Sequence, residues 1–166
     1  MIVVIMGVSG CGKTTVGRLL AKRLDWAYYE GDAFHPPENI EKMSQGVSLD
    51  DVDRGPWLAS IKEAIDRCAD GASDAVFACS ALRRKYRRTL SADVVDIRFV
   101  YLKGEFRTIR DRMKSRDRHY MKSNMLESQF SSLEEPDDAI EMDIKNSPQD
   151  IVERIESQLF DVGKSY

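Results

Sequence analysis

The chain has 166 residues, with 25 Lys and Arg against 28 Asp and Glu, and a formal net charge of −3. This length suits one compact domain with a proper core, and the slight acidic excess argues against broad nucleic-acid binding. Three cysteines without metal-ligand spacing favour a reducing compartment over a disulfide framework. The apolar start is too short for a signal peptide or a membrane span, so we expect a cytoplasmic protein with no membrane partner.

Apolar runs typical of buried strands recur along the chain, at residues 2–6, 27–30, 75–79, 97–102 and 139–144. Stretches with helical spacing alternate with them, at residues 14–24, 57–69, 83–90, 105–115 and 148–160. This alternation predicts a three-layer α/β/α fold with a five-stranded parallel sheet, in a single domain over residues 1–166. Two long segments interrupt it, residues 31–56 and 113–136, and such insertions are usually substrate loops or lids.

The first strand leads directly into Gly7-Val8-Ser9-Gly10-Cys11-Gly12-Lys13-Thr14, which matches the phosphate-binding loop G-x-x-x-x-G-K-[ST] in full. Its glycines allow close backbone approach, so main-chain N–H groups and the start of the next helix can hold phosphate oxygens. Lys13 is expected to reach the β- and γ-phosphates, and the Thr14 hydroxyl to ligate Mg²⁺. The sequence therefore predicts a P-loop NTPase fold with an ATP and Mg²⁺ site formed by this loop together with Thr15.

Cys11 lies inside the predicted phosphate loop, beside Lys13 and close to the start of a helix. The positive potential there is expected to favour the thiolate and to make the side chain oxidisable. The alternative is that a cysteine simply fills a permissive loop position.

An acidic residue follows the second strand, in Gly31-Asp32-Ala33-Phe34-His35-Pro36. An open α/β sheet presents ligands at the carboxyl ends of its strands, so Asp32 could accept a proton from a substrate hydroxyl or hold a metal-bound water. Alternatively, it caps a short helix near residue 38 or forms a turn. The chain contains no Asn-Lys-x-Asp motif, which argues against a GTP-binding switch.

Several longer segments resemble the gluconokinase family, the small kinases that phosphorylate D-gluconate on its 6-hydroxyl. The most specific is GDAFHPPENIEKM at residues 31–43, followed by GVSLDDVDRGPWL at 46–58. Others are ACSALRRKYRRTL at 78–90, RDRHYM at 116–121 and LESQFSSLEEP at 126–136. The resemblance extends from residue 6 to the final helix. The chain departs from the family at Ser48, Arg118 and Lys122, where members usually have Pro, Gly and Pro.

This resemblance implies ATP-dependent phosphorylation of D-gluconate, a nucleoside-monophosphate-kinase-like fold with a mobile lid at 113–136, and a homodimer without nucleic acid. It makes Asp32 the group that orients and deprotonates the acceptor hydroxyl, as general-base chemistry requires. His35 would contact the hydroxyls of the sugar acid, although a helix-start or packing role remains open for it.

Gluconate is an anion, and arginine can pair a carboxylate through two N–H groups. Arg54 and Arg83 are the best-placed candidates, and Ser80 could donate a hydrogen bond from the loop that also carries Arg83. The basic run at 83–88 could instead be a solvated helix face or a nucleic-acid patch. Within it, Arg87 shares the face of Arg83.

Arg112 and Arg116 lie four residues apart on a predicted helix and therefore share one face. Similar arginines in this kinase group close over the ATP phosphates and stabilise the charge that develops during transfer. His119 and Gln129 flank the lid and are expected on the substrate side. Other functions remain possible at this point: a related kinase acting on shikimate or a nucleoside monophosphate, or an ATP-binding regulatory protein without catalysis.

Overall fold

The computed structural model describes residues 1–115 and 123–160, with the side chains at positions 115, 123 and 124 excepted. Its strands are β1 (Ile2–Met6), β2 (Ala27–Glu30), β3 (Ala75–Ala78), β4 (Ile97–Lys103) and β5 (Ile140–Asp143). They form one sheet in the order β2-β3-β1-β4-β5, and every pairing is parallel. In the centre, Val4 of β1 is in register with Phe77 on one side and Phe99 on the other. The predicted five-stranded parallel sheet is confirmed.

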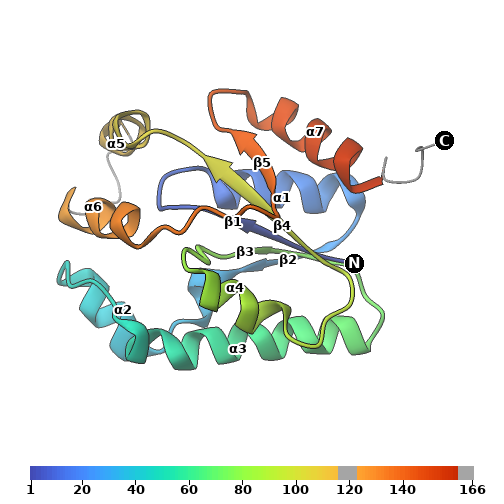
Figure 1. Cartoon of the computed structure of the whole chain (residues 1–166), viewed down its shortest axis with the longest axis horizontal. Coiled ribbons are helices and arrows are strands. Elements are labelled where there is room, and N and C mark those ends of the chain that lie inside the picture. The colour runs from blue at the N-terminus through green and yellow to red at the C-terminus, as the bar shows by residue number, and fades with distance from the viewer. Residues whose placement is uncertain (116–122, 161–166) are drawn as a thin grey trace.

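Helices cover both faces of this sheet, as Figure 1 shows. The helices α1 (Lys13–Leu24) and α7 (Pro148–Phe160) cover one face, and α3 (Asp51–Asp70) and α4 (Arg84–Ser91) cover the other. Three further helices, α2 (Pro37–Ser44), α5 (Phe106–Ser115) and α6 (Ser123–Ser132), gather at the left end of the molecule in Figure 1, towards which β1 and β4 point. The carboxyl edge of the sheet therefore carries the segments that follow the strands.

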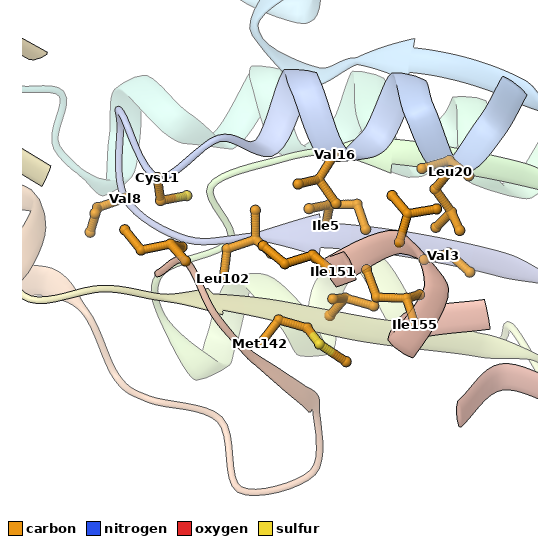
Figure 2. Close-up of a cluster of buried hydrophobic side chains, with 14 of the residues drawn as sticks. Val3, Ile5, Val8, Cys11, Val16, Leu20, Leu102, Met142, Ile151 and Ile155 are labelled. Atoms are coloured by element: carbon orange, nitrogen blue, oxygen red, sulfur yellow. The ribbon is translucent and has the colours of Figure 1, made fainter. Parts of the chain in front are cut away.

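The core consists of two layers, one on each face of the sheet. All five side chains of β1 are buried, and they point alternately into one layer and the other. Val3 and Ile5 belong to the layer under α1 and α7, which Figure 2 shows with Leu20 and Ile155 packed against them. The even-numbered residues of β1 belong to the layer under α3 and α4. This rigid sheet fixes the starting points of the loops at its carboxyl edge.

Two helices differ from the sequence-based expectation. Helix α3 begins at Asp51 rather than at residue 57, because Asp50 and Asp53 form a capping box ahead of Pro56. The Asp50 carboxylate accepts from the Asp53 N–H at 2.8 Å, and Asp53 accepts from the Asp50 N–H at 3.1 Å. Helix α6 lies in the charged segment for which no helix was predicted. None of the described helices has the length and apolar character needed to cross a membrane.

Candidate active site

The phosphate loop connects β1 to α1, and glycine conformations set its path. Gly12 adopts a left-handed conformation (φ 109°) immediately before α1, which only glycine adopts readily. Lys13 Nζ donates to the carbonyl oxygens of Gly7 and Val8, each at 3.1 Å. A Cβ atom at Gly10 would lie 2.7 Å from Met113 Cγ, so α5 packs directly onto the loop. The loop is thus a compact cradle whose ammonium group is already held at its centre.

Glu30, the last residue of β2, is a site residue that the sequence analysis missed. Its Oε2 accepts hydrogen bonds from Thr14 Oγ1 at 2.8 Å and from Tyr28 OH at 2.7 Å. Burial, together with this carboxylate, raises the pKa of Tyr28, so the phenol remains a donor. A hydroxyl and a carboxylate therefore meet beside the phosphate loop, and both are oxygen ligands of the kind that Mg²⁺ prefers.

Asp32 lies in a 3-10 turn, Gly31–Phe34, that directly follows β2. A Cβ atom at Gly31 would lie 2.4 Å from the Ala78 carbonyl oxygen, so the turn passes against the end of β3. The indole of Trp57 fixes the turn by donating to the Gly31 carbonyl at 2.8 Å. The Asp32 side chain is exposed, and no hydrogen bond to it is recorded among the described residues. The capping alternative is wrong, because Pro36 occupies the N-cap position of α2.

The position of Asp32 relative to the phosphate loop follows from their common neighbour. Burial raises the pKa of the Cys79 thiol, at the end of β3, to about 12, and the charges of Lys13 and Asp32 act on it in opposite directions. Both charges therefore lie near the end of β3. The geometry agrees: the turn that carries Asp32 passes against the Ala78 carbonyl, and the phosphate loop is attached to the next residues of the chain through the Gly7 N–H and the Ser80 carbonyl.

His35 stacks on Trp57, with ring centroids 4.6 Å apart and planes 7° from parallel. The buried side chain of Asn39 reaches it, with Nδ2 lying 2.8 Å from the Asp53 carbonyl oxygen and 3.2 Å from His35 Nδ1. Because a carbonyl can only accept, the Asn39 atom is the NH₂ group, and His35 Nδ1 must accept as well. The neutral ring then carries its proton on Nε2.

The charge state of His35 agrees with this tautomer. Burial lowers the pKa of His35, the nearby Arg54 guanidinium lowers it further, and Asp32 opposes both. The charges of Asp32 and Arg54 thus both act on His35. The structure therefore brings three of the sequence-predicted substrate residues together.

The two candidate arginines for the substrate carboxylate lie in different surroundings. Arg83 Nη1 donates to both carboxylate oxygens of Asp51, at 3.1 and 3.3 Å. Arg54 donates to the hydroxyl of Tyr86 at 3.3 Å, and its guanidinium lies 5.8 Å from the centre of the Tyr86 ring. Within the described part of the chain, no carboxylate forms an ion pair with Arg54. It is therefore the better candidate to receive an external carboxylate.

The structure corrects the expectation that Arg87, in the basic run at 83–88, lies on the substrate side with Arg83. Arg87 is buried and donates to the carbonyl oxygens of Ala81 and Leu82, so it supports the loop after β3 instead of facing a substrate. Ser80 lies in the same loop, and its own carbonyl accepts from the Gly7 N–H at 3.3 Å. The loop that carries Ser80 is thus attached to the phosphate loop.

Residues of the expected lid also contact the nucleotide side. Gln129 of α6 accepts from the Ser9 N–H at 2.7 Å, which places it against the phosphate loop and not within the substrate insertion. Arg112 of α5 donates to the Ile144 carbonyl at 2.6 Å, and its charge acts on Cys11 of the loop. Arg116 and His119 lie outside the described residues, as do Arg118 and Lys122.

The expected thiolate at Cys11 is not supported. The side chain is buried, and the loss of hydration raises the pKa of the Cys11 thiol despite the nearby charges of Lys13 and Arg112. Packing has overridden the positive potential of the helix start, so the neutral thiol is favoured.

The fold and the loop define the class of protein: a small P-loop kinase. A family model described as shikimate kinase matches residues 9–160. The APS kinase of Mycobacterium tuberculosis, solved with AMPPNP and APS, has the same fold at 16% identity, with a TM-score of 0.69 and 96% of each chain covered.

Closer relatives narrow this class. A gluconokinase from Gluconobacter oxydans is 47% identical over 81% of this chain and 76% of its own length. The thermoresistant gluconokinase of Escherichia coli is 42% identical over 81% of this chain and 77% of its own. The crystal structure of a gluconokinase from Sinorhizobium meliloti matches with a TM-score of 0.88 and 39% identity, covering 98% of this chain and 93% of that one. The chain therefore belongs to the gluconokinase family.

Proposed function

We propose that this protein transfers the γ-phosphoryl group of ATP to the 6-hydroxyl of D-gluconate, forming 6-phospho-D-gluconate. The observation that carries this proposal is that the insertion with Asp32, His35 and Arg54 is fixed by Trp57 against the end of β3, to which the phosphate loop is also attached. An acid, a neutral hydrogen-bond donor and a guanidinium are the groups that a linear sugar acid requires. Family membership favours the same substrate.

The nucleotide side of the proposed site uses the phosphate loop. Lys13 Nζ would hold the β- and γ-phosphates together with those N–H groups between Gly7 and Thr15 that are not already bonded within the protein. Thr14 would hold Mg²⁺, with Glu30 beside it, and the metal would neutralise charge between the two phosphates. Arg112 and Arg116 are proposed to approach the phosphates from the lid.

The acceptor side uses the insertion at residues 31–56. The exposed carboxylate of Asp32 would accept the proton of the 6-hydroxyl as it attacks the γ-phosphate. His35 would donate from Nε2 to a hydroxyl of the substrate, because its Nδ1 is already engaged by Asn39. Arg54 would pair with the carboxylate through the N–H groups that Tyr86 does not engage.

Other expected features belong to the same proposal. Ser80, Arg83 and His119 are proposed for the substrate side, whereas Gln129 would act from its place against the phosphate loop. The whole chain would act as one kinase domain with a lid at 113–136, and as a homodimer, which sedimentation velocity would measure.

The decisive experiment compares D-gluconate, glucose and shikimate as acceptors in a coupled assay, with the product identified by NMR. A neutral sugar leaves the arginine without its anionic partner, so gluconate should be preferred over glucose by at least ~10²-fold in kcat/KM. Arg54→Ala should reduce that preference by impairing gluconate alone. Equal rates on glucose, or a phosphate at another hydroxyl, would overturn the assignment.

A further inference from the structure

A short chain of hydrogen bonds links Arg54 to a second acidic residue of the insertion. Arg54 Nη1 donates to the hydroxyl of Tyr86, and the same hydroxyl donates to Oδ1 of Asp51. Asp51 is the first residue of α3, whereas Tyr86 lies in the first turn of α4. The chain thus crosses from the substrate insertion to the helix that follows β3.

The direction of these bonds is fixed by what each group can donate. A phenol has one proton, and here that proton goes to the carboxylate of Asp51. The oxygen of Tyr86 is therefore left as an acceptor, and it accepts a hydrogen bond from the guanidinium of Arg54. The Tyr86 side chain is only 4% exposed, so its ring cannot follow a moving arginine.

Asp51 is itself held in place from the opposite side. Its carboxylate accepts hydrogen bonds from Lys85 Nζ and Arg83 Nη1 in addition to that of Tyr86. These donors hold the pKa of Asp51 at about 2, so the carboxylate remains an acceptor throughout the neutral range. Arg83 is thus engaged by Asp51, while Arg54 is oriented through Tyr86.

From this arrangement we propose that Asp51 and Tyr86 are positioning residues that orient Arg54 for the carboxylate of the acceptor. One N–H group of the guanidinium is committed to Tyr86, and the ring of Tyr86 supports its face. The remaining N–H groups are presented in a fixed plane, which a bidentate pair with a carboxylate requires. This inference rests on the proposed function, because it assumes an acceptor with a carboxylate.

The test is Tyr86→Phe, which keeps the ring and removes only the hydroxyl. We expect the KM for gluconate to rise ~10-fold, about the value of one hydrogen bond to a charged group, with the KM for ATP and kcat within ~2-fold of the wild type. Asp51→Asn should also raise the KM for gluconate. The amide NH₂ group can donate to the Tyr86 hydroxyl, which would reverse the hydrogen bond between the two residues and disturb the one from Arg54. Tyr101→Phe is the matched control, because Tyr101 is also buried and its hydroxyl donates to a carboxylate, that of Glu135, at 3.4 Å.

A double-mutant cycle separates positioning from a general loss of structure. If Tyr86 acts through Arg54, then Tyr86→Phe should change kcat/KM for gluconate less than ~2-fold in an Arg54→Ala background. The slope of rate against gluconate concentration, far below saturation, gives this ratio even for weak variants. Additive losses, or an unchanged gluconate KM in Tyr86→Phe, would overturn the inference. Failure of the wild type to phosphorylate gluconate would instead overturn the proposed function, so the two failures are distinguishable.

Discussion

Two regions meet at the carboxyl edge of the sheet: the phosphate loop at residues 7–14 and the insertion at 31–56. Within the loop, Lys13 is held by carbonyls only five and six residues away, and glycine conformations set the path of the backbone. Besides its local contacts, such as the Asp50–Asp53 capping box, the insertion is held by side chains that are distant in sequence. Trp57 reaches back to Gly31, and Arg54 reaches forward to Tyr86.

This difference separates the expected consequences of substitution. The loop would hold the phosphates of ATP, which every acceptor needs for the reaction. Substitutions there should therefore abolish turnover with any acceptor. The insertion is a network in which each side chain orients another, so damage there should affect the acceptor and leave ATP binding intact. The following predictions test this separation in order of decreasing effect.

The largest loss is expected for Lys13→Ala in the phosphate loop. Removing the ammonium group eliminates charge stabilisation at the γ-phosphate, and we expect kcat/KM to fall by at least ~10⁴-fold. Lys22→Ala is the matched control, because Lys22 is exposed in the last turn of the same helix. The coupled assay measures both variants, and more than about a tenth of wild-type activity in Lys13→Ala would contradict the phosphate-clamp role.

The next largest loss is expected for Asp32→Asn in the insertion. An amide cannot accept the proton of the acceptor hydroxyl, so kcat should fall roughly 10³-fold, while the KM for ATP should stay within ~2-fold. Asp25→Asn is a suitable control, because Asp25 has a left-handed conformation (φ 56°) that asparagine tolerates. A near-normal kcat in Asp32→Asn would exclude the role of Asp32 as general base.

The same difference explains how much of the site the sequence could predict. The phosphate loop is a local motif with one structural solution, and the parallel sheet follows from the alternation of strands and helices. Asp32 was a candidate from its position after the second strand, whereas His35 and Arg54 were recognised through a family resemblance. Glu30 was missed because its partner, Thr14, comes from another element, and no periodicity encodes that contact.

Other misses have the same physical origin. Arg87 was expected on the substrate face with Arg83, yet it is buried because two main-chain carbonyls of the preceding loop need a donor. Cys11 lies in a positive potential, but burial dominates its pKa. In both cases tertiary packing, which a linear pattern does not contain, decided the outcome. The start of α3 was different. Asp50 and Asp53 have the spacing of a capping box, but Pro56 suggested that the helix begins after it.

A pair of glycines in the insertion gives the third prediction. At Gly31, an added Cβ would clash with the Ala78 carbonyl, so Gly31→Ala should lower the free energy of unfolding by about 1–3 kcal/mol. At Gly55, inside α3, no described heavy atom beyond its chain neighbours and the nearby backbone of the same helix lies within 4 Å of the corresponding position. Gly55→Ala should therefore raise the free energy of unfolding by up to about 1 kcal/mol. Urea titrations measure both, and equal effects of the two changes would contradict the close approach at Gly31.

The smallest expected effect is a pH dependence contributed by His35. Its pKa in the folded protein lies below the ordinary value of 6.5, mainly because the ring is half-buried on Trp57. The unfolded chain therefore binds the proton first as the pH falls. Protonation thus favours unfolding, and the free energy of unfolding should decrease between about pH 7.5 and about pH 5.5.

Comparison with a variant that cannot titrate isolates this contribution. His35→Gln keeps a polar side chain without a group that ionises in this range, so the wild type should lose more stability than the variant over the same interval. The difference should be less than about 1 kcal/mol, since water still reaches the ring and screens its charge. Urea titrations at both pH values measure it. A larger loss in His35→Gln would mean that Asp32 holds the proton on the ring more strongly than burial and Arg54 oppose it, and His35 would then enter the site as a cation.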